Sequence, residues 1–168
     1  MSRYYALSED YLHDYGITAG PKLPDPSIMA GEPVDGRLLP ELGFEVNVPD
    51  GEPRPHFMTG GTVIASDTPV AVLQGAGVHK FQCFPARLVD PRTGREHAGY
   101  RLFNVLGVAS LPRSEAGGAG RAAGGPGGLH MFRLVDSPST LVVDDVVRAA
   151  LVSNRPPEGW GILLEALG

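Results

Sequence analysis

The sequence predicts an α+β fold with mixed or antiparallel sheets and two short helices. Short apolar runs alternate with polar residues, as half-buried strands do. The 23 glycines and 16 prolines among 168 residues provide many turns and leave little room for long helices. A strand-helix pattern also occurs twice. Because 42% of the residues are hydrophobic and 20% charged, the chain can bury a core, and we expect residues 1–168 to form one domain.

The first third of the chain predicts two strands, residues 3–7 and 44–48. The second of them alternates Phe, Val and Val with Glu and Asn, which is the period of a strand with one buried face. Between them we expect a short helical turn that ends at Gly16, followed by an irregular loop rich in Pro and Gly over residues 18–40. Residues 49–55 predict a turn.

Two later segments have nearly the same pattern. TVIASDTPVAVL begins at residue 62 and TLVVDDVVRAAL begins at residue 140. Each has a β-branched run typical of a strand, then an acidic residue, then apolar positions with helical spacing. Each is followed by a further strand-like run. We therefore predict two similar strand-helix-strand units, at about residues 62–85 and 140–167.

Each copy carries an acidic residue at the start of its predicted helix, Asp67 in the first and Asp145 in the second. A carboxylate at this point accepts backbone N–H bonds and offsets the positive end of the helix dipole. We predict that both residues are helix caps in equivalent positions, with Ser66 and Asp144 beside them as further cap candidates. Paired catalytic carboxylates are the competing interpretation.

The remaining strands are expected at residues 80–90, 99–111, 129–136 and 160–167. A tract with seven glycines, residues 115–128, predicts a flexible surface loop, since it has too little apolar area to offset its ordering entropy. A phosphate-binding loop is disfavoured because the tract lacks Lys and a strand, not a helix, is expected after it.

No local motif predicts a metal, a cofactor or a catalytic site. The five histidines do not follow metal-ligand spacing, and the chain has neither a CxxC nor a GxSxG sequence. The single cysteine, Cys83, lies in an apolar strand, where cysteine usually acts as a small hydrophobic residue. An enzyme that pairs Cys83 with His56 or His79 is the alternative.

Negative charge is concentrated in the first third. Residues 1–50 carry nine acidic and three basic side chains, a sum of −6, whereas the formal charge of the whole chain is −5. This argues against a nucleic-acid partner, whose phosphates require Lys and Arg. It fits either contact with a basic protein or a solvated face. Without an 18-residue apolar span or an apolar signal sequence, we expect a cytoplasmic protein with no membrane contact.

Several motifs occur together in one order: YYAL, FEVNVPDG, VIASD…VL…GV…F.CFPA, Y…FNVLG and MFRL…LVVDDVVRAAL…GW. Over about residues 3–167 the chain resembles the type-eleven immunity-protein family of bacterial polymorphic toxin systems, a former domain of unknown function that is common in myxobacteria. The resemblance implies a cytoplasmic immunity domain that binds and neutralises a cognate toxin protein. It implies no set of catalytic residues.

We therefore expect a non-enzymatic immunity protein whose acidic side chains occupy a basic groove of the toxin. The candidate partner-binding residues are Asp10, Asp14, Asp25, Glu32 and Asp35. The alternative is a regulatory or scaffold protein-binding module with no toxin partner, which would use the loops at residues 18–40 and 49–61. The sequence leaves open whether the protein forms a homodimer.

Overall fold

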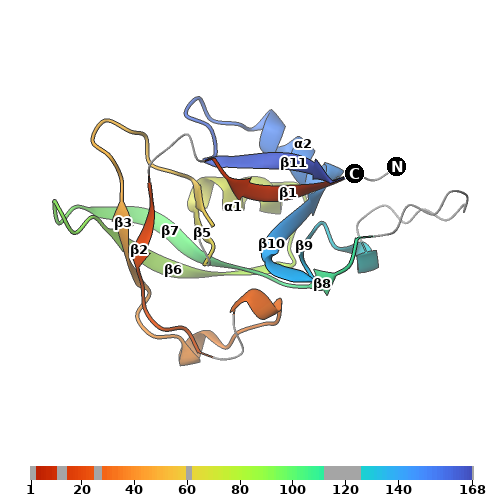
Figure 1. Ribbon diagram of the computed structural model, residues 1–168, viewed down its shortest axis with the longest axis horizontal. Helices are drawn as coiled ribbons and strands as arrows, with labels where there is room; N and C mark the ends of the chain where they lie inside the picture. The colour runs from red at the N-terminus through yellow and green to blue at the C-terminus, as the bar shows by residue number, and fades with distance from the viewer. Residues whose placement is uncertain (1–2, 11–14, 25–27, 60–61, 112–125, 168) are drawn as a thin grey trace, which may run out of the picture.

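The computed structural model describes residues 3–10, 15–24, 28–59, 62–111 and 126–167. Over these residues the chain forms two β-sheets, two α-helices and three short 3-10 turns, which confirms the predicted α+β class (Figure 1). No helix in these ranges is long and apolar enough to cross a membrane.

The first sheet joins the two ends of the chain. Its strand order is β11-β1-β10-β9-β8, and only β8 and β9 pair in parallel. The outer pair brings Tyr4 opposite Leu167, so the N- and C-terminal strands lie side by side (Figure 1). The strands are β1 (Tyr4–Glu9), β8 (Val108–Ala109), β9 (Met131–Leu134), β10 (Ser137–Asp144) and β11 (Ile162–Leu167).

The second sheet has six strands in the order β2-β3-β6-β7-β5-β4, and only β3 and β6 pair in parallel. Its centre is the long β6–β7 hairpin. The strands are β2 (Gly16–Ala19), β3 (Gly43–Asn47), β4 (Phe57–Met58), β5 (Ile64–Ser66), β6 (Phe81–Val89) and β7 (Glu96–Val105). The 3-10 turns are η1 (Ile28–Ala30), η2 (Gly36–Leu38) and η3 (Pro126–Gly128).

The two helices, α1 (Asp67–Gly75) and α2 (Asp145–Ser153), contact each other. One buried cluster contains apolar side chains from both helices and from both sheets. On the helices these are Val70 and Leu73 of α1 and Val147 and Leu151 of α2. The helices therefore belong to the shared core that joins the sheets.

The predicted strand-helix-strand unit is present twice. In the first unit α1 connects β5 to β6, and β7 lies between these strands. In the second unit α2 connects β10 to β11, and β1 lies between them. Both outer strands of each unit are antiparallel to the central one, so they run parallel to each other.

The similarity between the two units extends to one further strand in each sheet. This strand, β4 in one sheet and β9 in the other, forms a hairpin with the first strand of the unit. The order β6-β7-β5-β4 in one sheet corresponds to β11-β1-β10-β9 in the other. The central strand follows the first unit along the chain as β7, but it precedes the second unit as β1. One unit is thus permuted relative to the other, which sequence periodicity could not reveal.

The helix ends are also equivalent. The backbone N–H of Val78 donates to the carbonyl oxygen of Leu73 at 3.0 Å. The indole Nε1–H of Trp160 donates to the carbonyl oxygen of Leu151 at 2.8 Å. A buried residue after each helix therefore donates a hydrogen bond to a carbonyl group of the last helical turn, although the carbonyl oxygen of Leu73 also accepts from the N–H of Ala76 at 3.1 Å.

The helix starts confirm one prediction about the aspartates and correct another. Asp67 and Asp145 are equivalent, since each is the first residue of its helix. They are not the caps. The cap of α2 is Asp144, whose Oδ1 accepts from the N–H groups of Val146 at 3.0 Å and Val147 at 3.2 Å. In α1 the cap position belongs to Ser66, whose side chain makes no capping bond.

The physical reason for the correction is that each aspartate binds the central strand of its unit. Oδ1 of Asp67 accepts a hydrogen bond from Nε of Arg101 on β7 at 2.6 Å. The carboxylate of Asp145 accepts from the backbone N–H of Arg3 at 2.9 Å and from the hydroxyl of Tyr5 on β1 at 3.2 Å. Both carboxylates remain in the first turn, where negative charge is favourable.

Other differences are local. The helical turn predicted after Ser8 is wrong at its start, because β1 continues to Glu9, and its later part lies outside the described residues. The strand expected over residues 99–111 is divided at Gly107, whose φ of 114° favours glycine. Residues 115–125 of the Gly-rich tract lie outside the described residues, and residues 126–128 form η3.

We predict that Asp144→Ala lowers the free energy of unfolding by about 2 kcal/mol or more, because it removes the cap of α2 and leaves the N–H groups of Val146 and the buried Val147 without this acceptor. Urea unfolding followed by circular dichroism measures this change. Asp136→Ala, at an exposed turn, is the control and should change stability by less than about 0.5 kcal/mol. Equal effects of the two substitutions would contradict the capping role.

Candidate functional site

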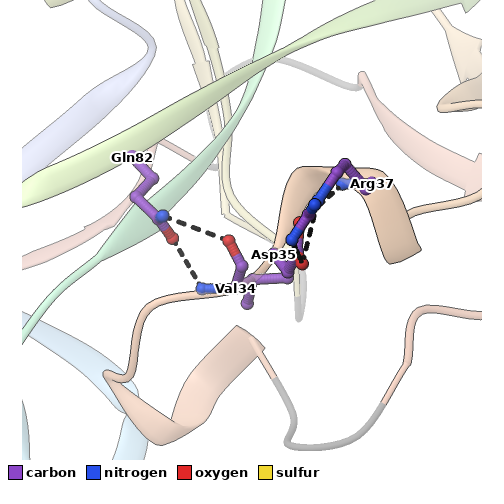
Figure 2. A network of polar contacts seen from close by, with 4 residues as sticks. All are labelled: Val34, Asp35, Arg37 and Gln82. Atoms are coloured by element: carbon purple, nitrogen blue, oxygen red, sulfur yellow. Dashed lines mark hydrogen bonds and ion pairs between the residues drawn. The ribbon is translucent and has the colours of Figure 1, made fainter.

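One exposed loop of the second sheet is held in place by side chains of the β6–β7 hairpin. We refer to residues 31–39 as the anchored loop. Oε1 of Gln82 accepts from the N–H of Val34 at 2.8 Å, and its Nε2 donates to the carbonyl oxygen of Val34 at 3.2 Å (Figure 2). This amide therefore pairs with the loop backbone in both directions, much as a neighbouring strand would.

A second amide supports the first. Nδ2 of Asn104, which is fully buried on β7, donates to the carbonyl oxygen of Glu32 at 2.9 Å and to Oε1 of Gln82 at 3.0 Å. The N–H of Gly107 donates to the carbonyl oxygen of Gly31 at 2.8 Å. The loop backbone is thus held at Gly31, Glu32 and Val34 by groups on β6 and β7 and next to them.

The tip of the anchored loop projects into solvent. Asp35 caps η2, because its Oδ1 accepts a hydrogen bond from the backbone N–H of Arg37 at 3.0 Å (Figure 2). The guanidinium group of Arg37 also donates to this carboxylate, with Nη2 2.8 Å from Oδ2. These hydrogen bonds hold the pKa of Asp35 below its usual value. The Arg37 side chain is 90% exposed and Leu38 is 70% exposed. The tip therefore combines an apolar side chain with an ion pair.

The structure brings together only part of the acidic set expected from sequence. Glu32 and Asp35 both belong to the anchored loop, which lies in the lower part of Figure 1. Asp10 lies at the end of β1 in the other sheet, where its N–H donates to the carbonyl oxygen of Gly161 at 3.1 Å. Asp14 and Asp25 lie outside the described residues.

A serine, a histidine and a glutamate form a hydrogen-bonded chain at the start of α1. Oγ of Ser66 lies 2.7 Å from Nδ1 of His56, and Nε2 of that ring lies 2.9 Å from Oε1 of Glu158. The order of groups matches that of a hydrolytic triad. Ser66, however, is only 8% exposed, so its hydroxyl has little access to a substrate.

A hydrogen-bonded pair of cap residue and histidine also occurs at the start of α2, which favours a structural role for the pair at α1. Nδ1 of His130 lies 2.7 Å from Oδ2 of Asp144, the residue equivalent to Ser66. In both units the cap residue also donates its backbone N–H to the carbonyl oxygen of its histidine, at 2.8 Å for His56 and 3.0 Å for His130. Each histidine fastens the helix start to the outer hairpin strand. The β4–β5 and β9–β10 hairpins differ in length, so His56 precedes Ser66 by 10 positions whereas His130 precedes Asp144 by 14. The two histidines therefore cannot be matched from their spacing in the sequence.

Cys83 lacks the surroundings of a nucleophile. It lies half-buried on β6, where burial raises the pKa of the thiol to about 11. Both ring nitrogens of His56 are engaged by Ser66 and Glu158. The exposed His79 makes no hydrogen bond to the thiol in the part of the chain that the structure describes. These contacts give the alternative interpretation, a pairing of Cys83 with either histidine, no geometric support.

Among the described residues, no group of three or more His, Cys, Asp or Glu side chains is arranged to hold a metal ion. A scan of the chain against protein-family models gives no match, and a search of the curated proteins finds no relative.

We predict that Gln82→Ala loosens the anchored loop. Without the amide, the N–H of Val34 loses its acceptor, and its hydrogen exchange should accelerate at least roughly tenfold. Exchange measured by NMR on the intact protein tests this. Gln74→Ala, an exposed change of the same kind on α1, is the control and should leave Val34 unaffected. Unchanged exchange of Val34 in Gln82→Ala would show that the loop is held by other contacts.

We also predict that the native Cys83 thiol reacts slowly. Because its pKa is raised from 9.0 to about 11, its thiolate fraction at pH 8 should be roughly a hundredfold below that of the unfolded chain. Iodoacetamide labelling, compared with and without urea, measures the difference, and the native rate should keep rising up to about pH 11. Rapid labelling at pH 7 would instead indicate an activated thiol.

Proposed function

We propose that this protein is a non-enzymatic immunity protein that binds and neutralises a cognate bacterial toxin, with the anchored loop as the centre of its contact. The observation that carries the proposal is the loop itself, which is exposed at its tip and fixed at its base. Two buried or half-buried amides, Gln82 and Asn104, hold its backbone. The toxin as the partner comes from the family resemblance.

Preorganisation is what makes such a loop suited to binding. Ordering a mobile loop costs conformational entropy, which lowers the affinity that its contacts would otherwise provide. Here that ordering is already achieved in the free protein by bonds to Val34, Glu32 and Gly31. The exposed Leu38 supplies an apolar anchor, and Arg37 is of a residue type enriched at the energetic centres of interfaces.

The charge distribution favours a basic partner surface around this anchor. Residues 1–50 sum to −6, so they attract a positively charged protein at long range. Within the anchored loop, Arg37 already compensates Asp35, and the uncompensated carboxylate is that of the exposed Glu32. We infer that Leu38 provides affinity, whereas the acidic first third mainly accelerates the encounter.

We predict that Leu38→Asp weakens binding to the toxin encoded beside this gene by at least roughly tenfold, because it places a charge in the apolar centre of the contact. Isothermal titration gives the dissociation constant, and growth of cells that co-express both proteins reports protection. The matched control is Val152→Asp on α2, which is 57% exposed and should preserve both binding and protection.

The wild-type protein decides between the proposal and its alternative. If it neither binds the neighbouring toxin nor protects against it, the immunity function is rejected. If it instead captures a non-toxin protein through Leu38, the regulatory or scaffold module is the correct description.

A further inference from the structure

The outer edge of β11 is the longest sheet edge in the part of the chain that the structure describes. β11 has six residues and pairs with β1 in an unbroken register. The other three edges are shorter: β8 and β4 have two residues each, and β2 has four and an irregular register. Short or irregular edges discourage pairing with another chain, whereas a long regular edge permits it. β11 is therefore the edge best suited to accept a further strand.

The backbone on the outer side of β11 is free to pair. In an antiparallel sheet, alternate residues of a strand direct both N–H and C=O toward one neighbour, and the residues between them direct theirs the other way. Within the described residues, the only hydrogen-bonding neighbour of Ile162–Leu167 is β1. The strand contains no proline, and Glu165 is its single charged residue. These groups therefore form a template for another strand.

The side chains of β11 leave apolar surface uncovered on both faces of the sheet. Ile162 and Leu164 pack against the core that contains the helices, but they are only partly buried. On the opposite face Leu163 is 44% exposed. A strand laid beside β11 would cover part of these side chains while its backbone pairs with the edge.

The other unit carries a strand on the corresponding side. β6 is the strand equivalent to β11, and β3 pairs in parallel with its last residues, from Arg87 to Val89. β2 then extends that sheet by a further strand. The architecture of the unit thus accommodates a strand on this side, whereas the sheet that contains β11 ends there.

We propose that β11 pairs with β11 of a second copy of this chain, in antiparallel orientation about a two-fold axis normal to the sheet. Such an axis keeps corresponding faces on the same side, so the two five-stranded sheets become one continuous sheet. Two registers pair the most residues of β11, and they are centred on Leu164 or on Glu165. The register centred on Leu164 avoids placing two glutamates opposite each other.

This register makes the edge complementary to itself. Leu164 lies opposite its copy, and the bulky Ile162 lies opposite the small Ala166. On the other face Leu163 lies opposite Glu165 of the second copy, where it can pack on the aliphatic part of that side chain. One patch on both copies therefore supplies the whole contact, as a two-fold interface requires.

The contact is small and separate from the anchored loop. A standard protein–protein interface buries roughly 1,600 Å², and one pair of six-residue strands is modest beside it, so we expect a weak, concentration-dependent dimer. β11 lies in the upper part of Figure 1, whereas the anchored loop lies in the lower part. Dimerisation therefore leaves the loop accessible and does not depend on the proposed toxin partner.

Sedimentation velocity at protein concentrations from about 5 to 500 µM tests the dimer, and the wild type should pass from monomer to dimer over this range. Leu163→Glu should raise the dissociation constant roughly tenfold or more, because it sets like charges opposite each other twice per dimer. Adding Glu165→Lys to the same chain should restore dimerisation, since opposite charges then face each other. Val135→Glu, which is 52% exposed in the turn between β9 and β10, is the matched control and should dimerise as the wild type does.

Circular dichroism confirms that each variant remains folded. The proposal is overturned if the wild type stays monomeric at the highest concentration. It is also overturned if Leu163→Glu and Val135→Glu have equal effects, or if the double variant does not recover dimerisation. If the wild type is monomeric and Leu163→Glu instead abolishes binding of the neighbouring toxin, the edge accepts a strand of the toxin and not a second copy.

Discussion

The structure depends on how each helix start is fixed between two strands. The N-terminal end of a helix carries N–H groups without partners and the positive end of the dipole. In both units the cap residue, Ser66 or Asp144, binds a histidine beside the outer hairpin strand, and the first helical residue, Asp67 or Asp145, binds the central strand. Each helix is thereby held in register with its sheet, and the two helices can meet in one core.

The β6–β7 hairpin links this scaffold to the anchored loop. Near one end, the cross-strand pair Gln82 and Asn104 holds the anchored loop. A long paired hairpin is stiff, so the base of the anchored loop is positioned by a rigid element.

The sequence indicated the region of the anchored loop but could not show how it is held. Residues 18–40 were expected to be an irregular contact loop because they are rich in Pro and Gly. Its supports lie far away along the chain, with 48 residues between Val34 and Gln82 and 72 between Glu32 and Asn104. The available signal was the presence of two amide side chains in otherwise apolar strands. Charge counting included Arg37 but could not show that it pairs with Asp35, two residues away.

By itself the sequence determined the α+β class, the two short helices and the repeated strand-helix-strand unit. These features follow from alternation, helical spacing and turn residues, which act over a few neighbouring positions. Only the tertiary structure decided that Asp144 is a cap while Asp145 contacts Tyr5, and that β1 completes the second unit. Those outcomes depend on partners that sheet pairing brings together from distant parts of the chain, such as Tyr5 and Asp145, which are 140 positions apart, and local patterns carry no information over such a distance.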